Sequence, residues 1–196
     1  ETEANREGRF SGRQDTPLTE RGRDQARAIG LALRNEVGSK PGLAFVSSPL
    51  RRALTTMEIV RATLDLPPGG YATDPRIQEI DLGDWDQLTA AEAKARNPRL
   101  FDERAADKWN VHVPGGENYA EVASRASDWI ASLNADTFAV SHGAFTRILR
   151  GLVAGLDAPR MSALNEPQGV VFRVKDNAVV QLAGVGPALS DPKPIG

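Results

Sequence analysis

The sequence predicts an α/β fold, a three-layer α/β/α sandwich with a mostly parallel central sheet. Two short apolar runs, at residues 43–46 and 137–141, are each followed directly by a pattern typical of a helix. Strands that alternate with helices require crossover connections, which produce a parallel sheet covered on both faces. The chain has 196 residues, 40% of them hydrophobic, so we expect one domain with a substantial core over residues 1–196.

The first part of the chain is expected to form a loop and then a helix. Residues 1–14 are charged and show no apolar period, which is typical of a loop. Thr19 is a candidate N-cap, and the helix after it should end before Gly38. The apolar residues of this helix share one face: Ala26, Ile29, Leu33 and Val37.

The central feature is the strand at 43–46 together with the helix that follows it. Ser48 is expected to cap that helix, and Pro49 suits its first turn. Arg51 and Arg52 then fall in the first turn, where the helix dipole makes a cation unfavourable unless an anion neutralises both. This placement indicates an anion site, and the alternative is that both arginines are simply solvated.

The rest of the chain is expected to continue the same pattern. In order, we expect an extended piece at 71–73, a loop at 76–85, short helices at 89–97 and 99–108, a helix at 119–133, a strand at 137–141, a helix with its core residues between 145 and 156, and a hairpin at 169–174 and 178–182. The tail, which contains Pro187, Pro192 and Pro194, is expected to be poorly ordered.

Composition excludes several classes of function. A formal net charge of -2 gives no general attraction to nucleic acid or to an anionic membrane, so neither is expected as a partner. The chain has no cysteine and only two histidines, His112 and His142, so we expect no metal site. No stretch approaches the roughly 18 apolar residues of a membrane span. The absence of cysteine fits a reducing compartment, and we expect a cytoplasmic location.

The two predicted strands end in small polar residues, one before Arg52 and the other at His142. In parallel α/β sheets, ligands bind beyond the carboxyl ends of the strands. If the two strands are neighbours, Arg52 and His142 share one pocket. A lone histidine is more often a core or surface residue than a catalytic one, but the position of His142 at a strand end favours a site.

Five motifs, in this order, resemble those of the histidine phosphatase superfamily, also called the phosphoglycerate mutase-like family. They cover nearly the whole chain, and the fold implied is phosphoglycerate mutase-like. The motifs are Glu1–Asn5 with Gly8–Gly12 and Asp15–Thr19, then Val46–Ala53, Glu79–Trp85, Pro114–Glu117 and Val140–Gly143. The family's Arg-His-Gly motif, which carries the nucleophilic histidine, would come immediately before Glu1. We therefore expect roughly ten further residues upstream, including a buried strand of about 4 to 8 residues.

The resemblance implies phosphoryl transfer to that upstream histidine and hydrolysis of the phosphohistidine, without a metal or an organic cofactor. It implies three catalytic residues: Arg52 as the fixed cation, His142 as a donor to a phosphate oxygen, and Glu79 as the general acid. Six further residues are expected to bind the substrate, namely Asn5, Arg9, Ser11, Gly12, Gly143 and Ala144.

The leading hypothesis is a phosphatase that acts on a small phosphorylated substrate, with the oligomeric state open. One alternative is a phosphoglycerate mutase, which usually carries a longer and more basic insertion than the acidic-leaning segment 85–115 found here. The other is a noncatalytic phosphate-binding relative that has lost its nucleophile. A binding module has no evident need for a general acid at Glu79, which favours the enzyme.

Overall fold

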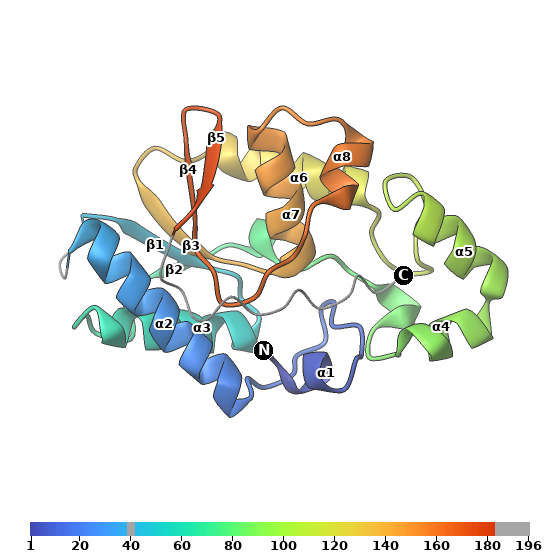
Figure 1. Ribbon diagram of the computed structural model, residues 1–196, viewed down its shortest axis with the longest axis horizontal. Coiled ribbons are helices and arrows are strands. Elements are labelled where there is room, and N and C mark those ends of the chain that lie inside the picture. The colour runs from blue at the N-terminus through green and yellow to red at the C-terminus, as the bar shows by residue number, and fades with distance from the viewer. Residues whose placement is uncertain (39–41, 183–196) are drawn as a thin grey trace.

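The computed structural model describes residues 1–38 and 42–182, and its centre is a three-stranded parallel sheet (Figure 1). The strand order is β2 (Ala72–Thr73), β1 (Ala44–Ser47) and β3 (Thr137–Val140). In the β1–β3 ladder Val46 lies opposite Ala139. The two predicted strands are therefore neighbours, and their carboxyl ends meet at one edge of the sheet.

Helices cover both faces of this sheet, which confirms the predicted sandwich. On one face lie α2 (Glu20–Val37) and α3 (Arg51–Thr63), and on the other α6 (Tyr119–Ala131) and α7 (Gly143–Val153) (Figure 1). Successive strand residues point to opposite faces. Phe138 accordingly packs in the cluster with α2 and α3, whereas the next residue, Ala139, packs against the cluster of α6 and α7.

A helical unit projects from one side of the sandwich (Figure 1). It follows the 3-10 turns η1 (Pro75–Ile77) and η2 (Gly83–Trp85) and contains α4 (Ala90–Arg96) and α5 (Pro98–Ala106). Trp85 anchors this unit, because its ring lies 5.5 Å from that of Phe101 and 6.1 Å from that of Phe10. Trp85 is thus buried beneath the unit.

The last described part of the chain adds α8 (Ala158–Ala163) and a separate hairpin of β4 (Phe172–Lys175) and β5 (Ala178–Gln181). The predicted hairpin is confirmed, with Lys175 paired to Ala178 across the turn. The expectation for the proline-containing tail falls outside the described residues. Among residues 1–38 and 42–182, none of the helices combines the length and the apolar character that crossing a membrane requires.

The prediction of a loop over residues 1–14 is wrong at α1 (Glu3–Arg6), which is a single helical turn. Two side chains stabilise this turn reciprocally. The backbone amide of Asn5 donates to Oγ1 of Thr2 at 3.2 Å, and the amide of Thr2 donates to Oδ1 of Asn5 at 2.9 Å. This capping box satisfies amides that would otherwise lack partners, so a charged segment without apolar period can still begin a helix.

The predicted cap of α3 is also wrong. Leu50, and not Ser48, is the N-cap residue, and it has no capping side chain. The carboxylate of Asp15, from the N-terminal loop, accepts hydrogen bonds from the amides of Arg51 at 2.6 Å and Arg52 at 3.4 Å. The anion that this helix start requires is therefore supplied by the protein itself.

Candidate active site

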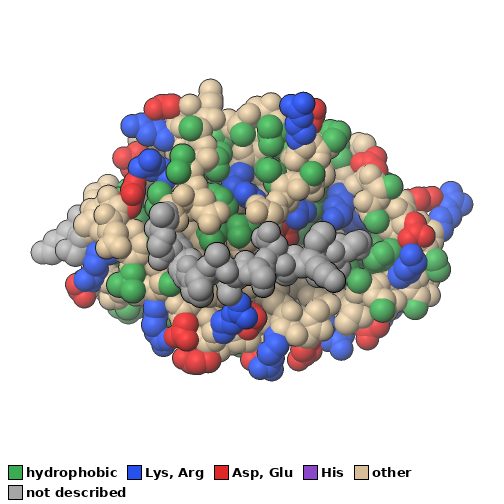
Figure 2. Space-filling view, viewed as in Figure 1, with side chains coloured by type: hydrophobic (Ala, Val, Ile, Leu, Met, Phe, Trp, Pro, Cys, Tyr) green, Lys and Arg blue, Asp and Glu red, His purple; other side chains and the backbone are tan. Residues whose placement is uncertain are grey.

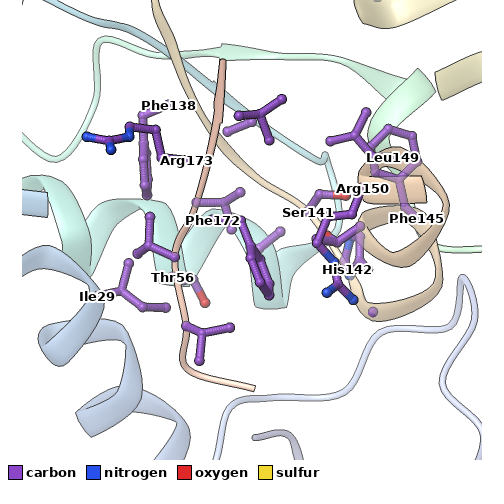
Figure 3. A pocket seen from close by; sticks show the side chains of 18 of the residues that line it. Ile29, Thr56, Phe138, Ser141, His142, Phe145, Leu149, Arg150, Phe172 and Arg173 are labelled. Carbon is purple, nitrogen blue, oxygen red and sulfur yellow. The ribbon is translucent and has the colours of Figure 1, made fainter. Parts of the chain in front are cut away.

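A cavity of about 950 Å³ lies at the carboxyl end of β3 and runs between β3 and β4. Ile29 of α2, Phe172 of β4 and His142 at the start of α7 surround the same space (Figure 3). Arg52 and Glu79 also line it. The fold thus brings the three predicted catalytic residues to one cavity from three separate elements.

Arg52 is held in a fixed orientation by the N-terminal loop. Its guanidinium donates from Nη2 to the carbonyl of Gly12 at 2.6 Å and from Nη1 to the carbonyl of Gln14 at 3.1 Å, and Nη1 lies 3.4 Å from the Asp15 carboxylate. Its Nε donates to Nδ1 of His142 at 3.3 Å. Burial lowers the pKa of Arg52, and the carboxylates of Glu79, Asp15 and Asp86 oppose that effect. Arg52 therefore presents a buried, positioned cation to the cavity.

The hydrogen bonds of His142 determine which of its two ring nitrogens carries the proton. Because Nε of Arg52 always carries a hydrogen, Nδ1 of His142 must accept, so the neutral ring carries its proton on Nε2. Nε2 lies 2.7 Å from Oγ of Ser48, to which it donates. Burial, and then the charges of Arg52 and Arg125, lower the pKa of His142 well below 6.5. His142 is thus a neutral donor near neutral pH.

The Glu79 carboxylate lies at the N-terminus of α7. It accepts the backbone amides of Ala144 at 3.3 Å and Phe145 at 3.2 Å. Burial, and then the charge of Glu166, raise the pKa of Glu79 to about 7, while the amides and Arg52 oppose the rise. A carboxyl group with this pKa can donate and accept a proton near neutral pH, as a general acid must.

Of the six predicted substrate-binding residues, three line the cavity and three do not. Asn5, Ser11 and Gly143 line the cavity. Ala144 instead gives its amide to Glu79, and Gly12 holds Arg52 by its carbonyl while its amide donates to Asp86 at 2.8 Å. Arg9 is not one of the described residues that line the cavity; its guanidinium pairs with Glu92 at 3.0 Å.

Three further residues of the site were not predicted. Asp15 could have been sought, because the first turn of α3 requires an anion. Ser48, which the sequence predicts as the cap of α3, instead accepts a hydrogen bond from His142. Glu166 lies in the loop between α8 and β4, where no periodicity or motif marks it. Within the described residues, no group of three or more His, Cys, Asp or Glu side chains is arranged to hold a metal ion.

The family model for the histidine phosphatase superfamily, branch 1, matches residues 1–176, and the chain belongs to this superfamily. The chain is 32% identical to glucosyl-3-phosphoglycerate phosphatase of Mycolicibacterium vanbaalenii, over 98% of this chain and 84% of that protein. It is 30% identical to phosphoserine phosphatase 1 of Hydrogenobacter thermophilus, over 80% of this chain and 74% of that protein.

Solved structures agree with this assignment. A putative alpha-ribazole-5'-P phosphatase from Escherichia coli has a TM-score of 0.79 at 23% identity, covering 98% of this chain and 95% of that one, and shares the fold. A mycobacterial glucosyl-3-phosphoglycerate phosphatase in complex with VO3 has a TM-score of 0.74 at 27% identity, covering 92% and 91%. The relatives from Mycolicibacterium vanbaalenii and Hydrogenobacter thermophilus and the mycobacterial structure are phosphatases by name, which supports a phosphatase enzyme here.

Proposed function

We propose that the protein hydrolyses a small phosphate monoester through a phosphohistidine intermediate. The observation that carries this proposal is the meeting of Arg52, His142 and Glu79 in one cavity. Phosphoryl transfer places charge on the equatorial phosphate oxygens, so it needs a fixed cation and neutral donors around them. Arg52 supplies the cation, and His142 donates from Nε2 to a phosphate oxygen in place of Ser48.

Glu79 acts first as the general acid that protonates the leaving group and then as the general base that accepts a proton from water. A histidine nitrogen attacks the phosphorus, the bond from phosphorus to the ester oxygen breaks, and protonated Glu79 gives its proton to that oxygen. Water then attacks the phosphohistidine, the phosphorus–nitrogen bond breaks, and the Glu79 carboxylate takes up a proton from the water. A pKa of about 7 supports both halves of this cycle.

We further propose that the nucleophilic histidine lies upstream of Glu1, on a strand that completes the domain within the cavity. Glu1 and Thr2 line the cavity together with His142, so a residue before Glu1 would lie near the site. The edge of β3 that faces away from β1 borders the same space, and β4 borders it from the other side. Backbone groups at such edges require hydrogen-bond partners, which an inserted strand provides.

The test is trapping of the phosphoenzyme made by the full-length protein. A substrate with labelled phosphate should leave an acid-labile, base-stable label on the histidine of an Arg-His-Gly motif encoded upstream of Glu1, with release of inorganic phosphate. Substitution of that histidine should abolish both the label and the phosphate release. A coding sequence without an upstream histidine, or turnover without any labelled enzyme, would refute the mechanism.

A further inference from the structure

Glu166 occupies a position beside the general acid that the proposed mechanism does not use. It lines the cavity together with Glu79 and His142, and its side chain is 35% exposed. A Cβ atom built on Gly143, the first residue of α7, would lie only 3.1 Å from Oε2 of Glu166. Glu166 therefore lies directly over the start of α7, whose next two amides bind Glu79.

The orientation of the Glu166 carboxylate is fixed from one side. Nη1 of Arg147, one turn along α7, lies 3.2 Å from Oε1 of Glu166 and donates to Oη of Tyr119 at 2.8 Å. Tyr119 lies in α6, and its side chain is buried in the hydrophobic core, so it anchors the guanidinium of Arg147. Oε2 of Glu166 has no hydrogen-bond donor among the described residues. It is thus an oriented acceptor at the start of α7, close to Glu79, the residue proposed to protonate the leaving group.

The surroundings of Glu166 select the kind of group it can bind. A carboxylate only accepts hydrogen bonds, so an anionic substrate group placed directly against Oε2 would bring two acceptors together with no hydrogen between them. Arg147, Lys108 and Arg150 lie near Glu166 as well, and Figure 2 shows Lys and Arg side chains near the middle of the face in view. Burial and then Arg147 lower the pKa of both Lys108 and Arg150, and Glu166 opposes this effect.

These cations disfavour an ammonium group in the same place. Arg147 already pairs with Glu166, and Lys108 has no carboxylate within 4.0 Å among the described residues. A positively charged substrate group would therefore meet uncompensated like charge. A neutral hydrogen-bond donor avoids both the contact between two acceptors and the repulsion from the cations. A hydroxyl group on the leaving group is such a donor.

We infer, on the basis of the proposed function, that Glu166 is a specificity-determining residue that accepts a hydrogen bond from a hydroxyl of the leaving group. The substrate class is accordingly the phosphate monoesters of polyols and sugars. Esters with a simple alkyl, ammonium or carboxylate group in that place are disfavoured.

The test compares four small esters on the full-length protein: glycerol 3-phosphate, n-propyl phosphate, phosphoethanolamine and 3-phosphoglycerate. Release of phosphate gives kcat/KM for each ester. We expect the parent protein to prefer glycerol 3-phosphate to n-propyl phosphate by about tenfold or more, since a site built to bind a hydroxyl discriminates against its absence. In Glu166→Ala this ratio should approach one, and Glu166→Gln, which keeps the shape and can still accept, should give an intermediate ratio.

Glu103→Gln is the matched control, because Glu103 pairs with Arg99 on the exposed face of α5. It should keep the parent ratio. An unchanged ratio in Glu166→Ala, or a parent preference for 3-phosphoglycerate or phosphoethanolamine, would overturn the inference while leaving the phosphatase intact. Release of phosphate from none of the four esters would overturn the proposed function and this inference with it.

Discussion

Nε of Arg52 lies 3.3 Å from Nδ1 of His142, although the two residues are 90 positions apart in the chain. This contact joins the first turn of α3 to the start of α7 across the carboxyl ends of β1 and β3. It also fixes the proton of His142 on Nε2. The predictions below follow from this contact and its neighbours.

Arg52→Gln is expected to lower kcat/KM for phosphate release by about 100-fold or more, because one fixed donor to a developing oxyanion is worth this much. Arg51→Gln is the matched control, since Arg51 is adjacent in sequence but has an exposed side chain. It should stay within about twofold of the parent, as surface substitutions usually do. Equal losses in the two variants would contradict the assignment of Arg52.

His142 is expected to be neutral, with its hydrogen on Nε2. Nitrogen-15 NMR of the imidazole should show this tautomer, and the ring should remain unprotonated at pH 6.5, because its pKa lies well below that value. In Arg52→Gln the charge that lowers this pKa is removed, so the pKa of His142 should rise. A ring that is fully protonated at pH 6.5 in the parent would exclude the neutral-donor role.

The raised pKa of Glu79 leads us to expect that turnover depends on pH. The pKa of its carboxyl group is about 7, above the usual 4.5, so the protonated acid predominates below about pH 7 and is lost above it. For esters with a poor leaving group, kcat should fall as the pH rises through this range. Glu79→Gln should be slow at every pH and lack this limb. For an aryl ester, whose leaving oxygen needs no proton, formation of the phosphohistidine should be much less affected in Glu79→Gln, whereas hydrolysis of the phosphohistidine, which needs the Glu79 carboxylate as a base, should stay slow.

The same carboxyl group also predicts a pH dependence of stability. A folded-state pKa of about 7 against 4.5 in the unfolded chain means that the folded state holds the proton more tightly. The free energy of unfolding of the parent, relative to Glu79→Gln, should therefore decrease as the pH rises from 4.5 to about 7. Urea unfolding of both proteins across this range measures the difference. A constant difference would mean that the pKa of Glu79 is not raised.

Asp15 is expected to act on both stability and activity, because it caps α3 and holds Arg52. Asp15→Ala should lower the free energy of unfolding by about 1 kcal/mol, the usual effect of losing a cap, and should also lower kcat/KM. Asp24→Ala in α2 removes an exposed carboxylate that pairs with Arg27 three residues away, and such surface changes stay within about 0.5 kcal/mol. Equal effects of the two substitutions would argue against the cap.

The sequence alone predicted the sandwich, its principal helices and strands, and the meeting of Arg52 with His142. Those predictions depend on hydrophobic period and on strand ends, which are local patterns. The short turn α1 could not be predicted from hydrophobic period, because a capping box, and not an apolar face, stabilises it. Glu166 escaped because its place is set by Arg147 and Gly143 in three dimensions, and no pattern in the loop from α8 to β4 encodes that contact.

The β4–β5 hairpin forms a sheet of its own, separated from β3 by the cavity. A two-stranded hairpin is at best marginally stable by itself. An extended segment between β3 and β4 would form hydrogen bonds with both strands and join the two sheets into one. If the nucleophilic histidine lies on this segment, as proposed above, then docking of the nucleophile and stabilisation of the β4–β5 hairpin would be a single cooperative event.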